Sequence, residues 1–132
     1  MSQVCVLVVV DVEGAITGGL ANHLYMIDNT GYFGSYGEGT DELTTACTEG
    51  QTINWTVTPV DPFTTIEITG FSGQMVSDGI CKPKQYDNPT GSYWAGIVES
   101  QGQSTTQQYT MTLSAQGQSM SFDPFLRITA AP

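Results

Sequence analysis

The chain has 132 residues and a formal net charge of -10, from 13 acidic residues against three basic ones. This length fits one domain that buries roughly two thirds of the surface of its unfolded chain, so we expect a single domain over residues 1–132. Nucleic acids and anionic lipids bind proteins through clustered Lys and Arg, so the charge excludes nucleic acids and anionic membrane surfaces as partners. Cations, neutral sugars, basic protein surfaces and further copies of the chain are compatible with it.

The chain starts with an apolar run from Val4 to Val10 that is rich in β-branched residues. The run lacks the basic start and the small-residue cleavage site of a signal peptide, and it is too short to span a bilayer. Its composition predicts a buried strand. We therefore expect no membrane insertion and a cytoplasmic protein, or one that is released without a cleaved signal peptide.

Seven β-rich runs, separated by Gly, Pro, Asn and Asp, predict the strands of the fold. The runs are Gln3–Val12, Asn22–Asp28, Gln51–Pro59, Thr64–Phe71, Ser92–Ser100, Gln107–Ala115 and Ser119–Thr129. Short strands at this spacing are typical of a sandwich or a barrel. The sequence therefore predicts an all-β fold, a two-sheet antiparallel β-sandwich of Greek-key or immunoglobulin-like type with about seven to nine strands.

Two runs show a two-residue period, which indicates strands with one buried face. The side chains predicted to face the core are Ile53, Trp55 and Val57 in one run and Tyr109, Met111 and Leu113 in the other. Residues 115–118 then form a predicted hairpin turn, after which Met120 and Phe122 point inward.

The stretches between the runs are less regular. Asp41–Thr48 allows one short helical turn, and no longer window has a helical period. Residues 73–91 are expected to be an irregular region that either faces a partner or connects two strands. Two Asp-Pro-Phe units, which end in Phe63 and Phe125, predict strand bends after which the Phe returns to the core.

Acidic and sulfur side chains provide the candidate ligands. Asp11 and Glu13, two residues apart, would share one face of a strand and could offer carboxylates to calcium, although a solvated acidic surface is the simpler explanation. Cys5 is expected to be a buried apolar residue. Cys47 and Cys81 lie at segment ends, so the sequence leaves open whether they form a disulfide or remain thiols.

Aromatic residues gather at two places where the chain is expected to turn. Tyr32, Phe33 and Tyr36 lie in a Gly-rich loop, and Tyr93 and Trp94 lie where a strand resumes. Such rings stack on sugars and anchor protein interfaces, and in a sandwich one member of a Tyr-Trp pair also packs in the core. They are the candidate binding residues of this chain.

Catalysis has little support in the sequence. The single histidine, His23, begins a predicted strand and is expected at an edge or on the surface. No local signature joins it to a cysteine nucleophile. We therefore expect a protein that is not an enzyme, has no catalytic residues and needs no cofactor other than the calcium considered above.

Short motifs recur along nearly the whole chain. They are Leu24-Tyr25-Met26-Ile27-Asp28-Asn29, the segment 34–40, Cys47 with Gly50-Gln51 and Trp55, Phe71-Ser72-Gly73, Cys81-Lys82-Pro83, Tyr93-Trp94-Ala95-Gly96, Tyr109 with Leu113, and Met120–Phe125. In their order and spacing these motifs resemble the AidA family, which is related to the PixA-type inclusion body proteins of bacteria.

The resemblance implies a small bacterial protein that is regulated by quorum sensing and associated with virulence or host colonisation. We expect it to act without catalysis, by binding a host or cell-surface protein and by self-association through its strand edges, which carry few charged residues. The alternatives are a glycan-binding lectin or toxin-like effector and an intracellular inclusion or storage protein.

Overall fold

The computed structural model describes residues 3–31, 35, 37, 39–40, 42–89 and 91–130, which form eleven strands and two short helices. The strands are β1 (Val4–Val10), β2 (Leu24–Asp28), β3 (Thr44–Thr48), β4 (Thr52–Pro59), β5 (Glu67–Ser72), β6 (Lys84–Asn88), β7 (Gly91–Ile97), β8 (Thr105–Gln108), β9 (Thr110–Ala115), β10 (Gln118–Phe122) and β11 (Phe125–Thr129). The helices are α1 (Val12–Gly18) and α2 (Gln74–Ser77).

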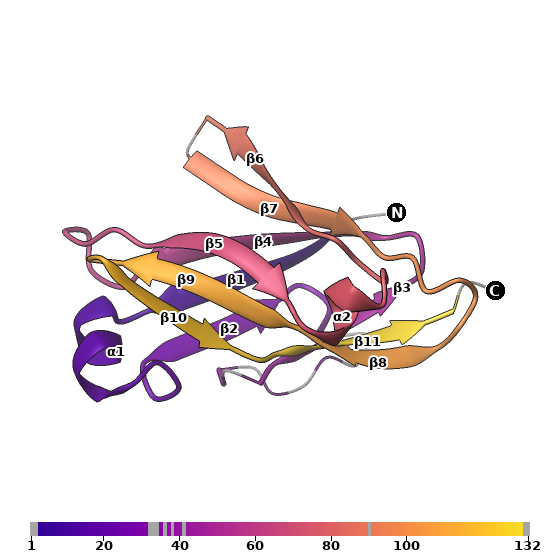
Figure 1. The fold of residues 1–132 in the computed structure, drawn as a ribbon, viewed down its shortest axis with the longest axis horizontal. Helices are drawn as coiled ribbons and strands as arrows, with labels where there is room; N and C mark the ends of the chain where they lie inside the picture. The colour runs from indigo at the N-terminus through magenta and orange to yellow at the C-terminus, as the bar shows by residue number, and fades with distance from the viewer. Residues whose placement is uncertain are drawn as a thin grey trace.

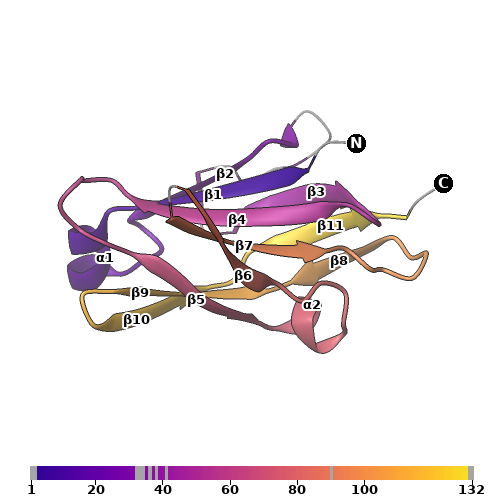
Figure 2. The ribbon, with the colours of Figure 1, turned by 90° about the horizontal axis from the view of Figure 1, so that it is seen from above.

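The strands form two layers (Figures 1 and 2). One layer is a five-stranded sheet in the order β2-β1-β4-β7-β6. The other consists of two three-stranded sheets, β10-β9-β5 and β3-β11-β8. This arrangement confirms the predicted all-β sandwich.

Two of the strand pairs are parallel, which corrects the expectation of a wholly antiparallel fold. β1 pairs with β4 in parallel over its full length, and β3 pairs with β11 in parallel. A parallel pair needs a long crossover connection, and here the segment between β1 and β4 includes α1, β2 and β3. Periodicity identifies a strand but does not reveal the direction of its neighbour.

Two predicted strands are each divided between the two smaller sheets. Gln107–Ala115 becomes β8 and β9, and Ser119–Thr129 becomes β10 and β11. The breaks lie opposite each other, because the backbone N–H of Tyr109 donates to the carbonyl oxygen of Pro124 at 3.0 Å. Proline has no N–H for the ladder, so the strand bends at Asp123-Pro124 and changes sheet.

The core lies between the layers and is centred on Trp55. Trp55 and Tyr109 are both 0% exposed, and the Trp55 Nε1–H donates to the Tyr109 hydroxyl oxygen at 3.1 Å. Phe71 packs on Trp55 with ring centroids 4.7 Å apart. The inward residues predicted from the two-residue period, among them Ile53 and Met111, are buried here, whereas Val57 is half-buried.

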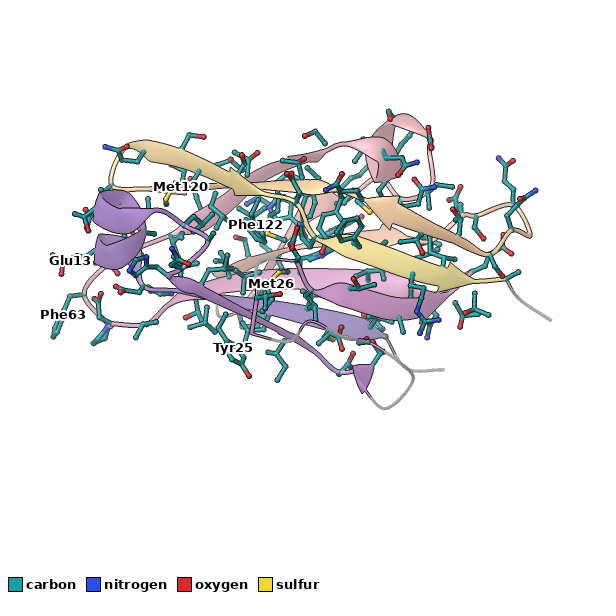
Figure 3. All side chains as sticks on the ribbon, turned by 90° about the horizontal axis from the view of Figure 1, so that it is seen from below. Glu13, Tyr25, Met26, Phe63, Met120 and Phe122 are labelled. Carbon is teal, nitrogen blue, oxygen red and sulfur yellow. The ribbon has the colours of Figure 1, made fainter. Side chains whose placement is uncertain are left out.

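The β9–β10 hairpin is confirmed by the antiparallel pairing that starts at Ala115 and Gln118. Figure 3 shows Met26 and Phe122 between the layers and Phe63 pointing away from the body of the molecule. Phe63 is 92% exposed, so the expectation that it returns to the core is wrong. Its turn is instead held by Asp61, whose Oδ1 accepts from the Phe63 backbone N–H at 2.8 Å.

Three further segments differ from the sequence predictions. The strand predicted to reach Val12 ends earlier, and Val12 begins α1. β3 stands where a helical turn was considered in Asp41–Thr48, because its β-branched threonines are buried in a ladder with β11. Residues 73–91, expected to be irregular, contain α2 and β6.

Candidate functional site

Tyr93 and Trp94 are neighbours on β7, and successive side chains of a strand point to opposite faces. Trp94 faces the core, where its Nε1–H donates to the Ile68 carbonyl oxygen at 3.1 Å and its ring lies 5.5 Å from Phe71. Tyr93 lies on the outer face of the sheet. The two residues therefore do not share one binding surface.

Tyr93 is joined on the outer face by a residue that the sequence analysis did not select. β6 and β7 pair antiparallel with Tyr86 opposite Tyr93, and the two rings stack with centroids 5.7 Å apart and planes 26° apart. Tyr86 is 47% exposed, and all five residues of β6 are exposed. We call Tyr86 and Tyr93 the tyrosine pair.

An open groove of about 620 Å³ runs beside the tyrosine pair. Two of the three basic residues of the chain, Lys82 and Lys84, line it, and Glu99 lies on the same groove. Asn54 of β4 and Gln3, which precedes β1, add amide groups. This is a polar and locally basic surface on a strongly acidic molecule, which suits contact with polar or anionic groups.

A second groove of about 620 Å³ lies at one end of the sandwich. It is lined by Gln3, Thr30, Ala46, Cys47, Thr48, Glu49, Gly50, Gln51, Thr52 and Thr129. Four of these residues are threonines and two are glutamines, and the sulfur-bearing residue, Cys47, is buried.

Cys47 and Cys81 are both free thiols, so the disulfide considered for them is not formed in this structure. Burial raises the pKa of each thiol to about 12. A protonated thiol is a poor nucleophile and a poor metal ligand, so neither group is reactive at neutral pH. Cys5 is exposed, which is opposite to the expectation, because the inward residues of β1 are Val4, Val6, Val8 and Val10.

Asp11 and Glu13 do not share the face of a strand, because the chain becomes helical between them. Asp11 is the N-cap of α1, and its Oδ1 accepts from the Gly14 backbone N–H at 3.2 Å. Glu13 lies in the first helical turn, where a negative charge favours the helix. Calcium binding at these residues stays a prediction, and the shared strand face on which it was based is not present in the structure.

Metal ligands do not gather elsewhere in the part of the chain that the structure describes. No group of three or more His, Cys, Asp or Glu side chains is placed there to hold a metal ion. The predicted aromatic residues Tyr32, Phe33 and Tyr36 lie outside the described residues.

His23 packs against α1. Its Nδ1 lies 2.8 Å from the Gly19 carbonyl oxygen, and its ring covers Gly14 and Gly18 so closely that a Cβ on Gly14 would lie 2.2 Å from its Cδ2. The half-buried ring therefore packs the loop that follows α1 against the helix. This placement gives His23 a structural role.

Sequence reasoning missed Tyr86 and Lys84 because it treated residues 73–91 as irregular. A signal was present, since Pro89 and Gly91 mark a turn between two runs that contain aromatic residues. β6 was not recognised as a strand because its residues are mostly polar, and a strand that is exposed on both faces has no apolar period.

Within the described residues, neither helix is long and apolar enough to cross a membrane. No curated protein matches the chain in sequence. The fold is similar to the crystal structure of the inclusion body protein PixA from Burkholderia cenocepacia J2315, with a TM-score of 0.72 and 11% sequence identity. The likeness covers 98% of this chain and 95% of that one. Residues 2–121 match the model of a family described as a domain of unknown function, DUF8788, and the chain belongs to this family.

Proposed function

We propose that this protein is a non-enzymatic, self-associating protein that accumulates inside the cell as ordered assemblies. The observation that carries the proposal is the likeness of its fold to PixA, an inclusion body protein, over 98% of the chain. At 11% identity the likeness concerns the fold, so the assembly is inferred for this chain.

The side chains that a catalyst would use support the same proposal. His23 is held against α1 by its contact with Gly19, and the thiols of Cys47 and Cys81 are kept protonated by burial. The exposed edge of the five-stranded sheet offers a surface for association rather than an enclosed pocket for a small substrate.

Quorum-sensing control and host association, which the AidA resemblance implies, stay predictions. Glycan binding also stays a prediction, and its aromatic basis is weaker because Trp94 packs toward Phe71 and Ile68. Intracellular assembly is the alternative that the likeness to PixA favours.

The first experiment measures the mass of the purified protein over a concentration series by sedimentation velocity and light scattering. We expect the mean mass to rise above 14.1 kDa as the concentration increases. A strict monomer at the highest soluble concentration overturns the proposal.

A second experiment distinguishes ordered inclusions from misfolded aggregates. Cells that produce the protein are fractionated, and the dense fraction is dissolved in mild buffer without denaturant. We expect the released protein to show the near-ultraviolet circular dichroism of the folded Trp55 environment. Material that dissolves only in denaturant, or that lacks this signal, contradicts storage in a folded form.

A further inference from the structure

Edge strands carry unpaired backbone N–H and C=O groups that bind another strand unless something covers them. Within the described residues, several edges are covered from outside their own sheet. On β2, the Met26 carbonyl oxygen accepts from the Gly39 backbone N–H at 2.8 Å. On β3, the Ala46 backbone N–H donates to Ser35 Oγ at 2.9 Å.

Two more edges carry protective features. On β8, the Gln108 backbone N–H donates to Gln74 Oε1 of α2 at 3.4 Å. β5 has an irregular register between Ile68 and Gly70, and such a bulge interrupts strand addition. This leaves β10 and, over Lys84–Asp87, β6 as the edge strands on which the described residues place no covering contact or bulge.

β6 is the more accessible of these two strands. All five of its residues are exposed, whereas β10 buries Phe122 and half-buries Met120 against the core. Figure 1 shows the end of β6 and the start of β7 standing away from the two-layer body. A second molecule can therefore align with β6 while the bodies of the two molecules stay apart.

The charge distribution favours a second copy at this edge. Each molecule carries a net charge of -10, so two copies repel each other over most of their surfaces. Lys84 offsets Asp87 within β6, and Lys82 lies just before the strand. Approach of an acidic copy is therefore least opposed at β6, because one of the three basic residues lies in the strand and another lies just before it.

The sequence of β6 is also complementary to itself. A two-fold axis perpendicular to the sheet and through Tyr86 pairs all five residues: Tyr86 with Tyr86, Gln85 with Asp87, and Lys84 with Asn88. No like charges face each other in this register. An axis through Lys84 or Asp87 places two like charges opposite, and an axis through Gln85 brings Pro83, which lacks an N–H, into the ladder.

We propose that two copies of this chain pair antiparallel through β6, about a two-fold axis at Tyr86, and join their five-stranded sheets into one continuous sheet. This inference rests on the proposed self-association and names its surface. The tyrosine pair of each copy would then meet across the axis in a row of four rings. Offset aromatic contacts of this kind add to the backbone hydrogen bonds of the new ladder.

The test changes the charge at Gln85, which faces Asp87 of the other copy twice in each dimer. Gln85→Glu places like charges opposite, and Gln85→Lys places opposite charges there. Gln118→Glu and Gln118→Lys on β10 are the matched controls, because they change the net charge equally at the other open edge. Sedimentation equilibrium gives the dimer dissociation constant of each variant, and circular dichroism confirms its fold.

Relative to the Gln118 controls, we expect Gln85→Glu to weaken the dimer and Gln85→Lys to strengthen it, each by roughly 2- to 30-fold. Equal shifts at the two positions, or larger shifts at Gln118, overturn pairing through β6 and leave the proposed self-association standing. A wild-type protein that remains monomeric overturns both.

Hydrogen exchange provides a measurement that does not depend on a substitution. The wild-type protein is compared at concentrations below and above the dissociation constant. We expect the backbone amides of β6 to gain protection with dimer formation while those of β10 do not change. Protection that appears on β10 and not on β6 contradicts the inference.

Discussion

The aromatic cluster around Trp55 and the tyrosine pair on β6 and β7 are built from similar side chains in opposite environments. In the cluster, which consists of Trp55, Phe71, Trp94 and Tyr109, the polar tips of both tryptophans are hydrogen-bonded. In the tyrosine pair, the rings stack at 5.7 Å on the outer face of the sheet, where Tyr86 is 47% exposed and Tyr93 is half-buried.

This difference separates residues that hold the fold from residues that are available for contact. A buried indole N–H without an acceptor is costly, so each tryptophan is fixed by its partner as well as by packing. An exposed tyrosine has water as its alternative partner and contributes little to folding. Tyr93 and Trp94 are adjacent in the chain, yet Trp94 belongs to the residues that hold the fold and Tyr93 to those that are available for contact.

The largest expected effect comes from removing the centre of the cluster. Trp55→Ala should lower the free energy of unfolding by about 3–5 kcal/mol, because the lost ring leaves a cavity between the layers. Urea denaturation measures this loss. Tyr86→Ala, measured in the same way on dilute protein, should change stability by less than about 1 kcal/mol. Similar losses in the two variants would show that the tyrosine pair also holds the fold.

Gly96 on β7 lies between the aromatic cluster around Trp55 and the tyrosine pair. A Cβ there would lie 2.7 Å from the Cys81 Sγ and 3.3 Å from the Pro83 Cα, so the chain leading into β6 must move. Gly96→Ala should therefore cost about 2 kcal/mol. Gly70→Ala is the control, because nothing lies within 4 Å of its Cβ. Equal thermal denaturation midpoints for the two variants would contradict this close packing.

A single hydroxyl group should distinguish the buried Tyr109 from Tyr93, which is half-buried on the outer face of the sheet. Tyr109→Phe leaves the Trp55 Nε1–H without its acceptor and should lower the free energy of unfolding by about 1–2 kcal/mol. Tyr93→Phe, which removes the same group on the outer face, should have almost no effect on the dilute protein. Urea denaturation of the two variants measures the contrast, and an unaffected Tyr109→Phe variant would mean that another acceptor replaces the hydroxyl.

The buried thiols predict a smaller, pH-dependent effect. Below pH 9 they are protonated in both states, so their contribution to stability is fully present. Between pH 9 and about 12 the unfolded chain loses these protons while the folded chain keeps them, so stability falls as the pH rises. We expect a loss of about 1 kcal/mol for each thiol at pH 10.

Urea denaturation at pH 7.5 and pH 10 measures this dependence. The Cys47→Ala/Cys81→Ala double variant should lose part of it and keep a smaller part, because burial also raises the pKa of Tyr109. Cys5→Ala should behave like the wild type, since Cys5 is exposed. If the double variant loses as much stability between pH 7.5 and pH 10 as the wild type does, the two thiols are not the cause of the pH dependence.

The sequence by itself determined the strands with one buried face and the sandwich class. Ile53 and Trp55, and likewise Met111 and Leu113, alternate with threonines or an asparagine, and this period is kept in any arrangement that buries one face. The β9–β10 hairpin followed from the same local information. The candidate site followed only in part, because Tyr93 was found and Tyr86 and Lys84 were not.

Only the tertiary structure decided how the strands are paired. The parallel ladder joins β1 with β4, which are distant in the chain, and the change of sheet depends on the contact between Tyr109 and Pro124. The stacking of Tyr86 on Tyr93 involves a polar strand that has no apolar period. Local periodicity records which face of a strand is buried, whereas register and neighbours depend on contacts made by the whole fold. For that reason self-association was a prediction from the sequence, and the proposal that β6 mediates it required the structure.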